Sequence, residues 1–382
     1  MLSYRLTNGA GRSGRPHPEL RMFENLRALA EKICAVPSVS GFEGAFADLV
    51  CSLLEGSVDS ARRDRLGNVI AAREGRGGKK LNLLFEAHMD QIGLIITKIE
   101  ENGVIRFSNI GGINPLTLFG KRVKVFGKET FFGVIGMKPP HIAAEEELSA
   151  VETLDKLYID AGSRTRMESE RLVSVGDVAL LDYHSSALSG DHFASSGLDD
   201  KAGVLTLLSC AGLLGAMKAY HDVTFLFSVQ EEVGLRGAKV GGYTLAPDAA
   251  VVCDVTFGDP MSDARGTVPE VVTGKGPAIS KGPGYYPPLV KRLCEIAKRE
   301  DIPVQEEIEA APGGTDAFVI QTAKRGVYTG GISVPLRYMH SQTEIINLKD
   351  VYRASKLLAL LAMEEDPLGN GDVKGEKARG SG

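Results

Sequence analysis

The chain has 382 residues, enough for two or three domains at the usual size of roughly 100–200 residues per domain. Its 44 basic and 49 acidic residues give a net charge of −5, and no long stretch combines basic with aromatic residues as a nucleic-acid-binding face does. Apolar residues make up 43% of the chain and charged residues 24%, as in ordinary globular proteins. Composition therefore excludes a disordered or fibrous protein and argues against a nucleic-acid partner.

The sequence indicates neither a membrane span nor a secretory signal. The longest apolar stretches, such as Ala202–Ala216, are shorter and more interrupted than the roughly 20 apolar residues of a membrane span. The N-terminus has Arg and Gly where a signal peptide needs an apolar run. The five cysteines are widely spaced and include no C-x-x-C pair, which is typical of reduced thiols. We therefore expect a cytoplasmic protein that does not bind a membrane.

A polar extension precedes the first predicted element. Residues 1–21 are rich in Gly, Arg and Pro, and helical periodicity begins near Met22, which is a plausible alternative start. The segment Gly9–Gly14 matches a G-x-G-x-x-G fingerprint, but no apolar strand precedes it and no helix follows, so we interpret the match as coincidence. We expect residues 1–21 and 365–382 to be flexible tails.

Between these tails, short apolar strands alternate with amphipathic helices, which is typical of an α/β sheet covered on both faces. In chain order, the predicted strands and helices cover residues 82–90, 201–217, 223–232, 251–255, 288–299 and 348–363. The last helix follows Asn347, a favourable N-cap, and has Asp350 in its first turn.

A β-rich segment interrupts this alternation from about residue 92 to residue 190. The pair Asn102-Gly103 is a signal for a type I′ hairpin turn. The predicted strands are two runs within residues 93–110, a second hairpin at residues 121–137, and short strands within residues 157–162 and 171–183. We predict an all-β domain over residues 92–190, inserted into an α/β domain formed by residues 22–91 and 191–364.

Polar residues end several of the apolar runs, where ligands bind in an open α/β sheet. His88 and Asp90 lie two residues apart and so face one side of a strand. Glu231 and Glu232 are adjacent and point apart, so one could bind a cation while the other accepts a proton. Asp254 lies in a strongly apolar run, where a carboxylate is costly to bury unless it is paired or metal-bound. Taken singly, His88 also fits a satisfied strand-end histidine and the glutamate pair a solvated loop.

Two further segments complete the candidate site. Asp199 and Asp200 stand where a helix begins, and an N-cap needs only one of them. His340 follows an apolar run. Histidines and acids together form a nitrogen and oxygen donor set that suits Zn²⁺, Co²⁺ or Mn²⁺ better than Ca²⁺ or Mg²⁺. The H-E-x-x-H, P-loop and G-x-S-x-G motifs are absent from the sequence.

Six motifs, in order, resemble those of the M42 metallo-aminopeptidases, or TET peptidases, a group often labelled glutamyl aminopeptidase or endoglucanase. They are AHMDQIG, GLDDKAG, QEEVGLRGA, CDVTFGDP, APGGTDA and SVPLRYMHS, and the likeness covers about residues 23–363. Related M20 and M28 exopeptidases share some motifs, but Asp199 lies 109 positions after Asp90, where M42 members carry a β-rich dimerisation domain. The resemblance implies a three-layer α/β/α, zinc-exopeptidase-like catalytic domain, with residues 92–190 as the inserted domain.

The resemblance also implies the metal ligands, carried over position by position. Asp199 would bridge two divalent ions, with His88 and Asp254 binding one ion and Glu232 and His340 the other. Zn²⁺ or Co²⁺ is expected, with Mn²⁺ as a further candidate.

Glu231 is similar to the family's general base, and Asp90 to the acid that orients His88. The sequence departs from the common pattern at Lys201, usually Arg, and at Gln342, often Pro. Neither is a ligand, so these departures bear on fine substrate preference rather than on the chemistry.

We therefore expect a dinuclear metallo-aminopeptidase that removes N-terminal residues from peptides, using metal-activated water and Glu231 as the base. The resemblance further implies a homo-oligomer, a dodecamer built from dimers. The alternatives are an M20-like deacylase or carboxypeptidase, an endoglucanase, which would use two carboxylates without a cation, and a non-catalytic scaffold, which would tolerate loss of a ligand. Asp316 and Arg337 are assigned no role beyond support of the ligands.

Overall fold

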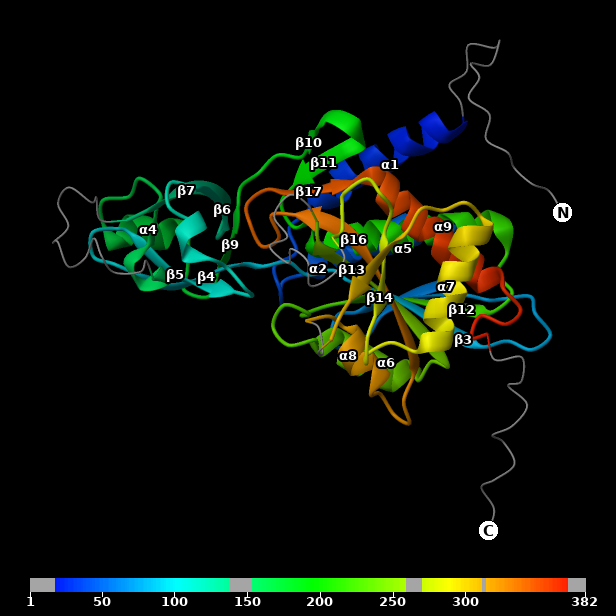
Figure 1. The fold of residues 1–382 in the computed structure, drawn as a ribbon. Coiled ribbons are helices and arrows are strands. Elements are labelled where there is room, and N and C mark those ends of the chain that lie inside the picture. The colour runs from blue at the N-terminus through cyan, green and yellow to red at the C-terminus, as the bar shows by residue number, and fades with distance from the viewer. Residues whose placement is uncertain (1–17, 138–152, 259–269, 311–313, 370–382) are drawn as a thin grey trace.

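Figure 1 shows the computed structural model of the chain, in which residues 18–137, 153–258, 270–310 and 314–369 are described. A large α/β domain carries a small β-barrel at one side, so the molecule is elongated. Several predicted features lie wholly or partly outside the described residues: the Gly9–Gly14 fingerprint, most of both tails, and parts of the motifs CDVTFGDP and APGGTDA.

The large domain is built on an 11-stranded sheet. The main path runs β1 (Ser60–Arg63), β2 (Val69–Arg73), β12 (Asp222–Ser228), β3 (Asn82–His88), β13 (Ala249–Phe257), β16 (Tyr328–Arg337), β17 (Glu344–Asn347), β11 (His192–Ser195) and β10 (Ser186–Ala187). Off this path, β14 (Ala278–Lys281) pairs with β16 and with β15 (Gln305–Ile308). The central strands β12, β3, β13 and β16 are parallel, so their carboxyl ends meet at one edge of the sheet.

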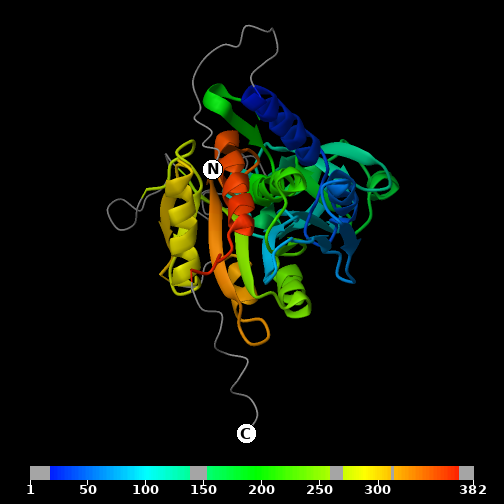
Figure 2. The ribbon, with the colours of Figure 1, turned by 90° about the vertical axis from the view of Figure 1, so that its right-hand side faces the viewer.

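Helices cover both faces of this sheet, which confirms the predicted three-layer α/β/α fold (Figures 1 and 2). One face carries α1 (Pro18–Cys34), α2 (Gly44–Leu54), α5 (Leu198–Met217) and α9 (Leu348–Met363), and the other carries α6 (Arg236–Leu245) and α8 (Ala317–Gln321). The amphipathic helix α7 (Pro287–Arg299) packs on β14 and against α9.

Helix α5 is long and apolar enough to cross a membrane by length and composition alone. It packs on β3, β13 and α9, and 67% of its most apolar stretch is buried inside the protein. These contacts make α5 the central core helix of the large domain.

The predicted ends of the α/β domain need correction. Helix α1 begins at Pro18, four residues before Met22. Proline is tolerated in a first helical turn because its missing N–H would lack a partner there. The helix can therefore include Pro18, although the apolar periodicity begins only near Met22. At the other end, Leu368 falls in the predicted tail but is buried in the large core. The cap of α9 is as predicted, because the Asn347 side chain accepts the Lys349 N–H at 3.0 Å.

The barrel lies between Asp90 and Asp199 in sequence. Its strands close in the order β4 (Gly93–Ile99), β5 (Ile105–Ile110), β8 (Tyr158–Asp160), β7 (Thr130–Gly136), β6 (Arg122–Phe126) and β9 (Val178–Leu181). Its apolar core is separate from that of the large domain. Leu94 in the first strand pairs with Ala179 in the last, so the chain enters and leaves the barrel side by side.

Two local predictions for this segment are wrong. The β4–β5 turn is not type I′, because Gly103 has a positive φ of 87° and Asn102 does not. The Gly103 N–H donates to the Glu100 carbonyl at 2.9 Å, as in a longer hairpin loop with Gly in the left-handed region. The segment is also not all-β: helix α4 (Arg166–Leu172) starts at the capping side chain of Thr165 and takes up the beginning of a predicted strand. Short 3₁₀ turns cover Pro115–Thr117 (η1), Leu154–Lys156 (η3) and Ser189–Asp191 (η4).

Candidate metal centre and active site

The predicted site residues come from segments far apart in the chain that meet at the carboxyl edge of the parallel strands. His88 ends β3 and Asp90 follows it, Glu231 and Glu232 follow β12, Asp254 lies within β13, Asp199 lies at the start of α5, and His340 lies in the β16–β17 loop. All except Glu232 and His340 are buried.

Asp199 faces both histidines. Its Oδ1 lies 3.1 Å from Nε2 of His88, and its Oδ2 lies 3.1 Å from Nε2 of His340. Donor atoms that share a tetrahedral ion at about 2.0–2.2 Å lie about 3.4 Å apart. One carboxylate therefore places each of its oxygens beside a different imidazole at a separation close to that of ligands to a common ion.

Two groups of possible ligands result. Asp199, Glu232 and His340 form one, in which Nε2 of His340 is also 3.2 Å from Oε1 of Glu232. His88, Asp254 and Asp200 form the other, in which Nε2 of His88 is 4.0 Å from Oδ1 of Asp254. Asp199 thus lies within reach of both groups.

Asp200 also has a structural task. Asp199 and Asp200 have non-helical backbone angles, so the regular helix begins at Lys201, as predicted. Oδ1 of Asp200 accepts the Gly203 N–H at 2.8 Å, which caps that helix. Its buried Oδ2 has no hydrogen-bond partner among the described residues.

The charge balance of the site fits a bound cation. Burial raises the pKa of Asp200 and of Asp254 well above the usual range. Burial also acts to raise the pKa of Asp199, but hydrogen bonds from His340 and His88 lower it overall. Hydrogen bonds to Asp199 and Glu232 raise the pKa of His340 to about 11. Buried carboxylates outnumber the two imidazoles, and positive charge would stabilise their ionised forms.

The Asp90 carboxylate accepts hydrogen bonds from the backbone of both glutamates. Its Oδ1 accepts the Glu231 N–H at 2.9 Å and its Oδ2 accepts the Glu232 N–H at 3.2 Å, while the Ser40 hydroxyl donates to Oδ2 at 2.6 Å. Its Oδ1 lies 3.6 Å from Nδ1 of His88, farther than the Asp90 backbone carbonyl at 3.1 Å. Asp90 therefore contacts both the histidine and the turn that carries Glu231.

Glu231 carries a buried carboxyl group. Burial raises its pKa to about 9, with His88 opposing the rise and Asp254 and Asp316 adding to it. A carboxyl group in this environment ionises only when nearby positive charge favours the charged form.

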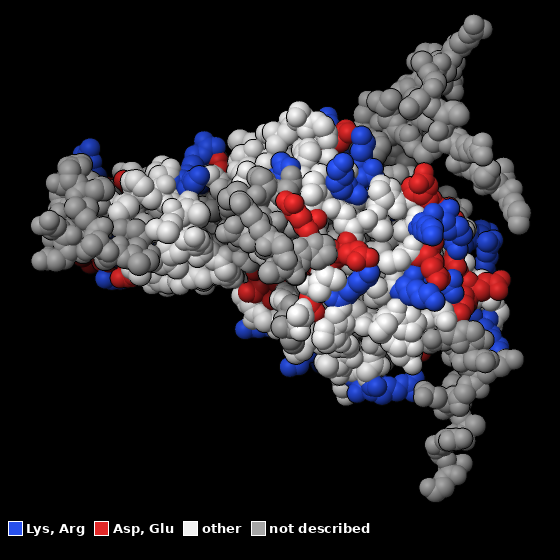
Figure 3. Space-filling view, viewed as in Figure 1, with Lys and Arg blue, Asp and Glu red and all other residues white. Residues whose placement is uncertain are grey.

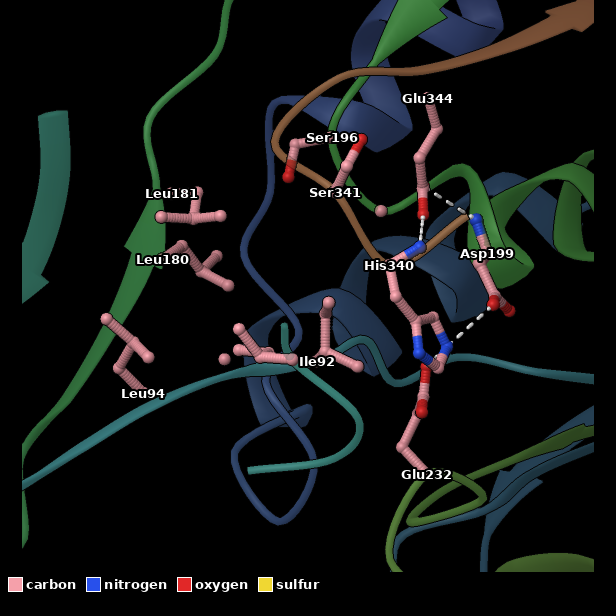
Figure 4. A pocket seen from close by; sticks show the side chains of 13 residues that line it. Ile92, Leu94, Leu180, Leu181, Ser196, Asp199, Glu232, His340, Ser341 and Glu344 are labelled. Carbon is pink, nitrogen blue, oxygen red and sulfur yellow. Dashed lines mark hydrogen bonds and ion pairs between the residues drawn. The ribbon is translucent and has the colours of Figure 1, made fainter. Parts of the chain in front are cut away.

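Sequence reasoning missed Glu344, the first residue of β17. It is 2% exposed; its Oε1 accepts the His340 N–H at 2.8 Å and its Oε2 accepts the Asp199 N–H at 3.2 Å (Figure 4). One carboxylate thus fixes the backbone of two candidate ligands. Only two apolar residues, Ile345 and Ile346, separate Glu344 from Asn347, so no strong local signal marks this acid.

The remaining noted residues occupy supporting positions. Asp316 is buried and accepts a hydrogen bond from the Ser228 hydroxyl at 2.8 Å. Burial, and then Asp316, raise the pKa of Glu86. Lys201 donates to Oε1 of Gln91 at 2.6 Å, and burial lowers its pKa to about 8. The Gln342 side chain donates to the Asp182 carbonyl at 2.7 Å, and Arg337 ends β16.

A small pocket lies beside Asp199, Glu232 and His340 and reaches the barrel (Figure 4). Asp199, Glu232 and His340 lie at one side of it, and Leu94 of β4 and Leu180 of β9 lie at the other. The barrel therefore forms part of the wall of the site.

Comparison with known proteins identifies the family. The chain matches the family described as M42 glutamyl aminopeptidase over residues 67–357. It is 37% identical over 344 residues to a lysyl aminopeptidase of Pyrococcus furiosus, covering 89% of this chain and 97% of that protein.

Solved structures agree. An aminopeptidase from Desulfurococcus kamchatkensis has a TM-score of 0.86 and 35% identity, covering 94% of this chain and all of that one (100%). The TET1 peptidase of Pyrococcus horikoshii, described as assembling into a tetrahedron or a large octahedral shell, has a TM-score of 0.77 and 32% identity, covering 89% of this chain and 99% of that one. These findings do not favour the deacylase or glucanase alternatives. The chain is therefore a peptidase that belongs to the M42 family of aminopeptidases.

Proposed function

We propose that this protein is a dinuclear metallo-aminopeptidase that removes N-terminal residues from peptides. The observation that carries the proposal is the position of Asp199, whose two oxygens each lie 3.1 Å from Nε2 of a different histidine. Asp199 would bridge two divalent cations, with His88 and Asp254 completing one site and Glu232 and His340 the other. We assign Asp200 to the helix cap because one of its oxygens is already engaged by Gly203.

The donor set favours particular ions. Imidazole nitrogens mixed with carboxylate oxygens suit Zn²⁺ or Co²⁺, and Mn²⁺ is a further candidate. Two such cations would supply Lewis-acid chemistry, polarising the scissile carbonyl and lowering the pKa of the attacking water.

Glu231 acts as the general base. It accepts a proton from the attacking water and returns it to the leaving amine. Asp90 positions Glu231 by accepting its backbone N–H, and it restrains the His88 ring from the side opposite to Asp199. Glu231 would be ionised near neutral pH if cations held by the neighbouring ligands offset the cost of its burial.

We further propose a homo-oligomer, a dodecamer built from dimers through the barrel. Support comes from the assembly described for the TET1 peptidase and from exposed apolar side chains on the barrel. Leu116, Phe119, Phe132 and Val134 are all exposed, and the described barrel surface seen in Figure 3 is mostly uncharged. Light scattering at micromolar concentration should report a large assembly, and a monomer alone would contradict this.

The cysteines support a reducing compartment. All five, Cys34, Cys51, Cys210, Cys253 and Cys294, are free thiols. We propose a cytoplasmic location, which fractionation of the source cells would test.

The deciding assay uses chelated protein resupplied with Zn²⁺, Co²⁺ or Mn²⁺ and a panel of aminoacyl chromogenic substrates. Activity should vanish on chelation, return with metal, and be absent on a peptide with a blocked α-amino group. Equal cleavage of blocked and free peptides would point to the deacylase or carboxypeptidase alternative. Chelator-insensitive cleavage of a glucan would point to an endoglucanase.

A further inference from the structure

The turn that follows β12 carries Glu231, and side chains hold its backbone N–H groups. The four consecutive N–H groups of residues 229–232 each donate to a side-chain oxygen. Asp90 accepts the last two of them. The first two donate to Asn68 and Glu43, two residues outside the proposed mechanism.

Glu43 reaches this turn from the segment before α2. It is 6% exposed, and its Oε1 accepts the N–H of Gln230 at 3.1 Å and that of Gly41 at 2.7 Å. The same segment supplies Ser40, whose hydroxyl donates to Asp90. This segment therefore supports the turn that carries the base twice, once directly and once through Asp90.

Asn68 holds the start of the turn and is fully buried. Its Oδ1 accepts the Val229 N–H at 3.0 Å, while its Nδ2 donates to the Gly237 carbonyl at 3.0 Å and to Oδ2 of Asp64 at 2.7 Å. Those two donations fix which way the amide faces, so its oxygen is turned toward Val229. Asn68 thereby joins the residue after β12 to the first turn of α6.

The turn needs such support because part of its backbone is in an unfavourable conformation. Gln230 has a positive φ of 58°, in the left-handed region that costs free energy for a residue other than Gly. Such a conformation persists when surrounding contacts hold it. Because Gln230 directly precedes Glu231, a change in its backbone angles would turn the Glu231 side chain in a new direction.

We propose that Glu43 and Asn68 are positioning residues for the general base: they hold the two N–H groups before Glu231 and so fix the direction of its carboxylate. This role rests on the proposed function of Glu231. Neither residue is a candidate metal ligand, so their loss should slow the chemical step and leave metal binding intact.

The first experiment removes each acceptor and measures kcat, KM, metal content and melting temperature of the metal-loaded protein. Glu43→Ala and Asn68→Ala should lower kcat by roughly 10- to 100-fold, the scale for a catalytic group displaced by about 1 Å. KM and metal content should match those of the wild type, because neither residue binds substrate or metal. Glu43→Gln keeps an oxygen that can accept the same N–H groups, so it should restore most of the lost kcat.

The matched control is Asp350→Ala, because Asp350 is also a buried carboxylate that accepts two backbone N–H groups, from Gly274 and Gly276. It should lower the melting temperature and keep the wild-type kcat. An equal fall of kcat in Asp350→Ala would mean that loss of any buried carboxylate has this effect, and would overturn the inference. If Glu43→Ala does not fold, Glu43→Asp, which draws the acceptor back by one methylene, should still lower kcat by a smaller factor.

The second experiment combines Glu43→Ala with Glu231→Gln. If Glu43 acts through the base, its loss should have almost no further effect once residue 231 can no longer accept a proton. Effects that multiply in the double variant would overturn the positioning role.

Two further outcomes separate this inference from the proposed function. Unchanged kcat in both alanine variants of an active enzyme would overturn the inference and leave the proposed function standing. Absence of cleavage by the wild-type protein with every metal would instead overturn the proposed function, and this inference with it.

Discussion

The open sheet of the large domain and the closed barrel bury different kinds of side chain. Among the described residues, every buried acidic side chain lies outside the six barrel strands, including Asp90, Asp199, Asp254 and Glu344. In the part of the barrel that the structure describes, the six strands and their connections bury one polar residue, Ser169, whose hydroxyl donates to the Gly103 carbonyl.

This difference follows from topology. Parallel strands end together at one edge, where loops can bring several carboxylates and imidazoles to one point. A closed barrel pairs its strands all round and fills its interior with apolar residues. The large domain therefore carries the reactive groups, while the barrel contributes a surface that shapes access to them.

The largest expected effect tests the roles that we propose for the two adjacent glutamates, Glu231 as base and Glu232 as metal ligand. Glu231→Gln keeps the side-chain volume but cannot accept a proton, so activity should fall by a factor on the order of 10²–10⁴ with both metals retained. Glu232→Gln should instead lower metal occupancy, with partial rescue by excess metal. Metal content measured beside turnover checks both. Loss of metal from Glu231→Gln with full occupancy in Glu232→Gln would reverse the roles.

Substitutions that create a cavity in the apolar core of the barrel or of the large domain test whether the two domains unfold independently. Ile135, in β7, and Leu226, in β12, are both fully buried, and replacing either by Ala should cost about 2–5 kcal/mol of stability. Ile135→Ala should lower the melting temperature without changing metal content, whereas Leu226→Ala should lower both. Calorimetry and elemental analysis make the measurement. Metal loss from Ile135→Ala would mean that the barrel and the site unfold together.

Replacing Glu344 should have a smaller effect, on metal affinity, and Asp350 provides a matched control. Glu344→Gln removes one of two acceptors for the His340 and Asp199 N–H groups, and metal affinity should fall by about 10- to 100-fold. Asp350 is also buried and accepts two backbone N–H groups, but these belong to Gly274 and Gly276, which are not candidate ligands. Asp350→Asn should lower stability and leave metal affinity intact, as measured by metal titration. Equal metal affinity in the two variants would remove the positioning role of Glu344.

The smallest expected effect concerns His221, which lies in the large domain just before β12, at the opposite end of that strand from Glu231. His221 is buried, its Nδ1 accepts the Leu81 N–H at 3.0 Å, and burial lowers its pKa. The neutral ring is therefore favoured in the folded state, and its contribution to stability is complete above about pH 6.5 and decreases as the pH falls below that value. The drop in melting temperature from about pH 7.5 to about pH 5.5 should be smaller for His221→Gln than for wild type. The exposed His184, replaced in the same way, should leave the drop unchanged.

Much of the fold was predictable because its signals are local. The alternation of apolar strands with helices and the cap at Asn347 depend on neighbours within a few residues. The α1 start failed because Pro18 precedes the apolar pattern, and α4 failed because a seven-residue helix has little periodicity to detect.

The candidate ligands could be proposed because each ends or interrupts an apolar run, and the ordered motifs resemble one family. The hydrogen bonds that hold these ligands in place could not be predicted. Asp90 bonds to Glu231 across 141 positions, and Glu344 bonds to Asp199 across 145. No local pattern encodes such pairs, because they are created only when the sheet assembles.

The pairing of Leu94 with Ala179 means that the barrel joins the large domain through two adjacent strands, as an inserted domain that could be exchanged as a whole. Its entry and exit strands are hydrogen-bonded neighbours, so replacing everything between them needs no change in the path of the surrounding chain. Exchanging barrels among related peptidases should therefore transplant the wall of the pocket while leaving the metal ligands in place. Selectivity could then be redesigned, or could diverge in evolution, without altering the groups that perform the hydrolysis.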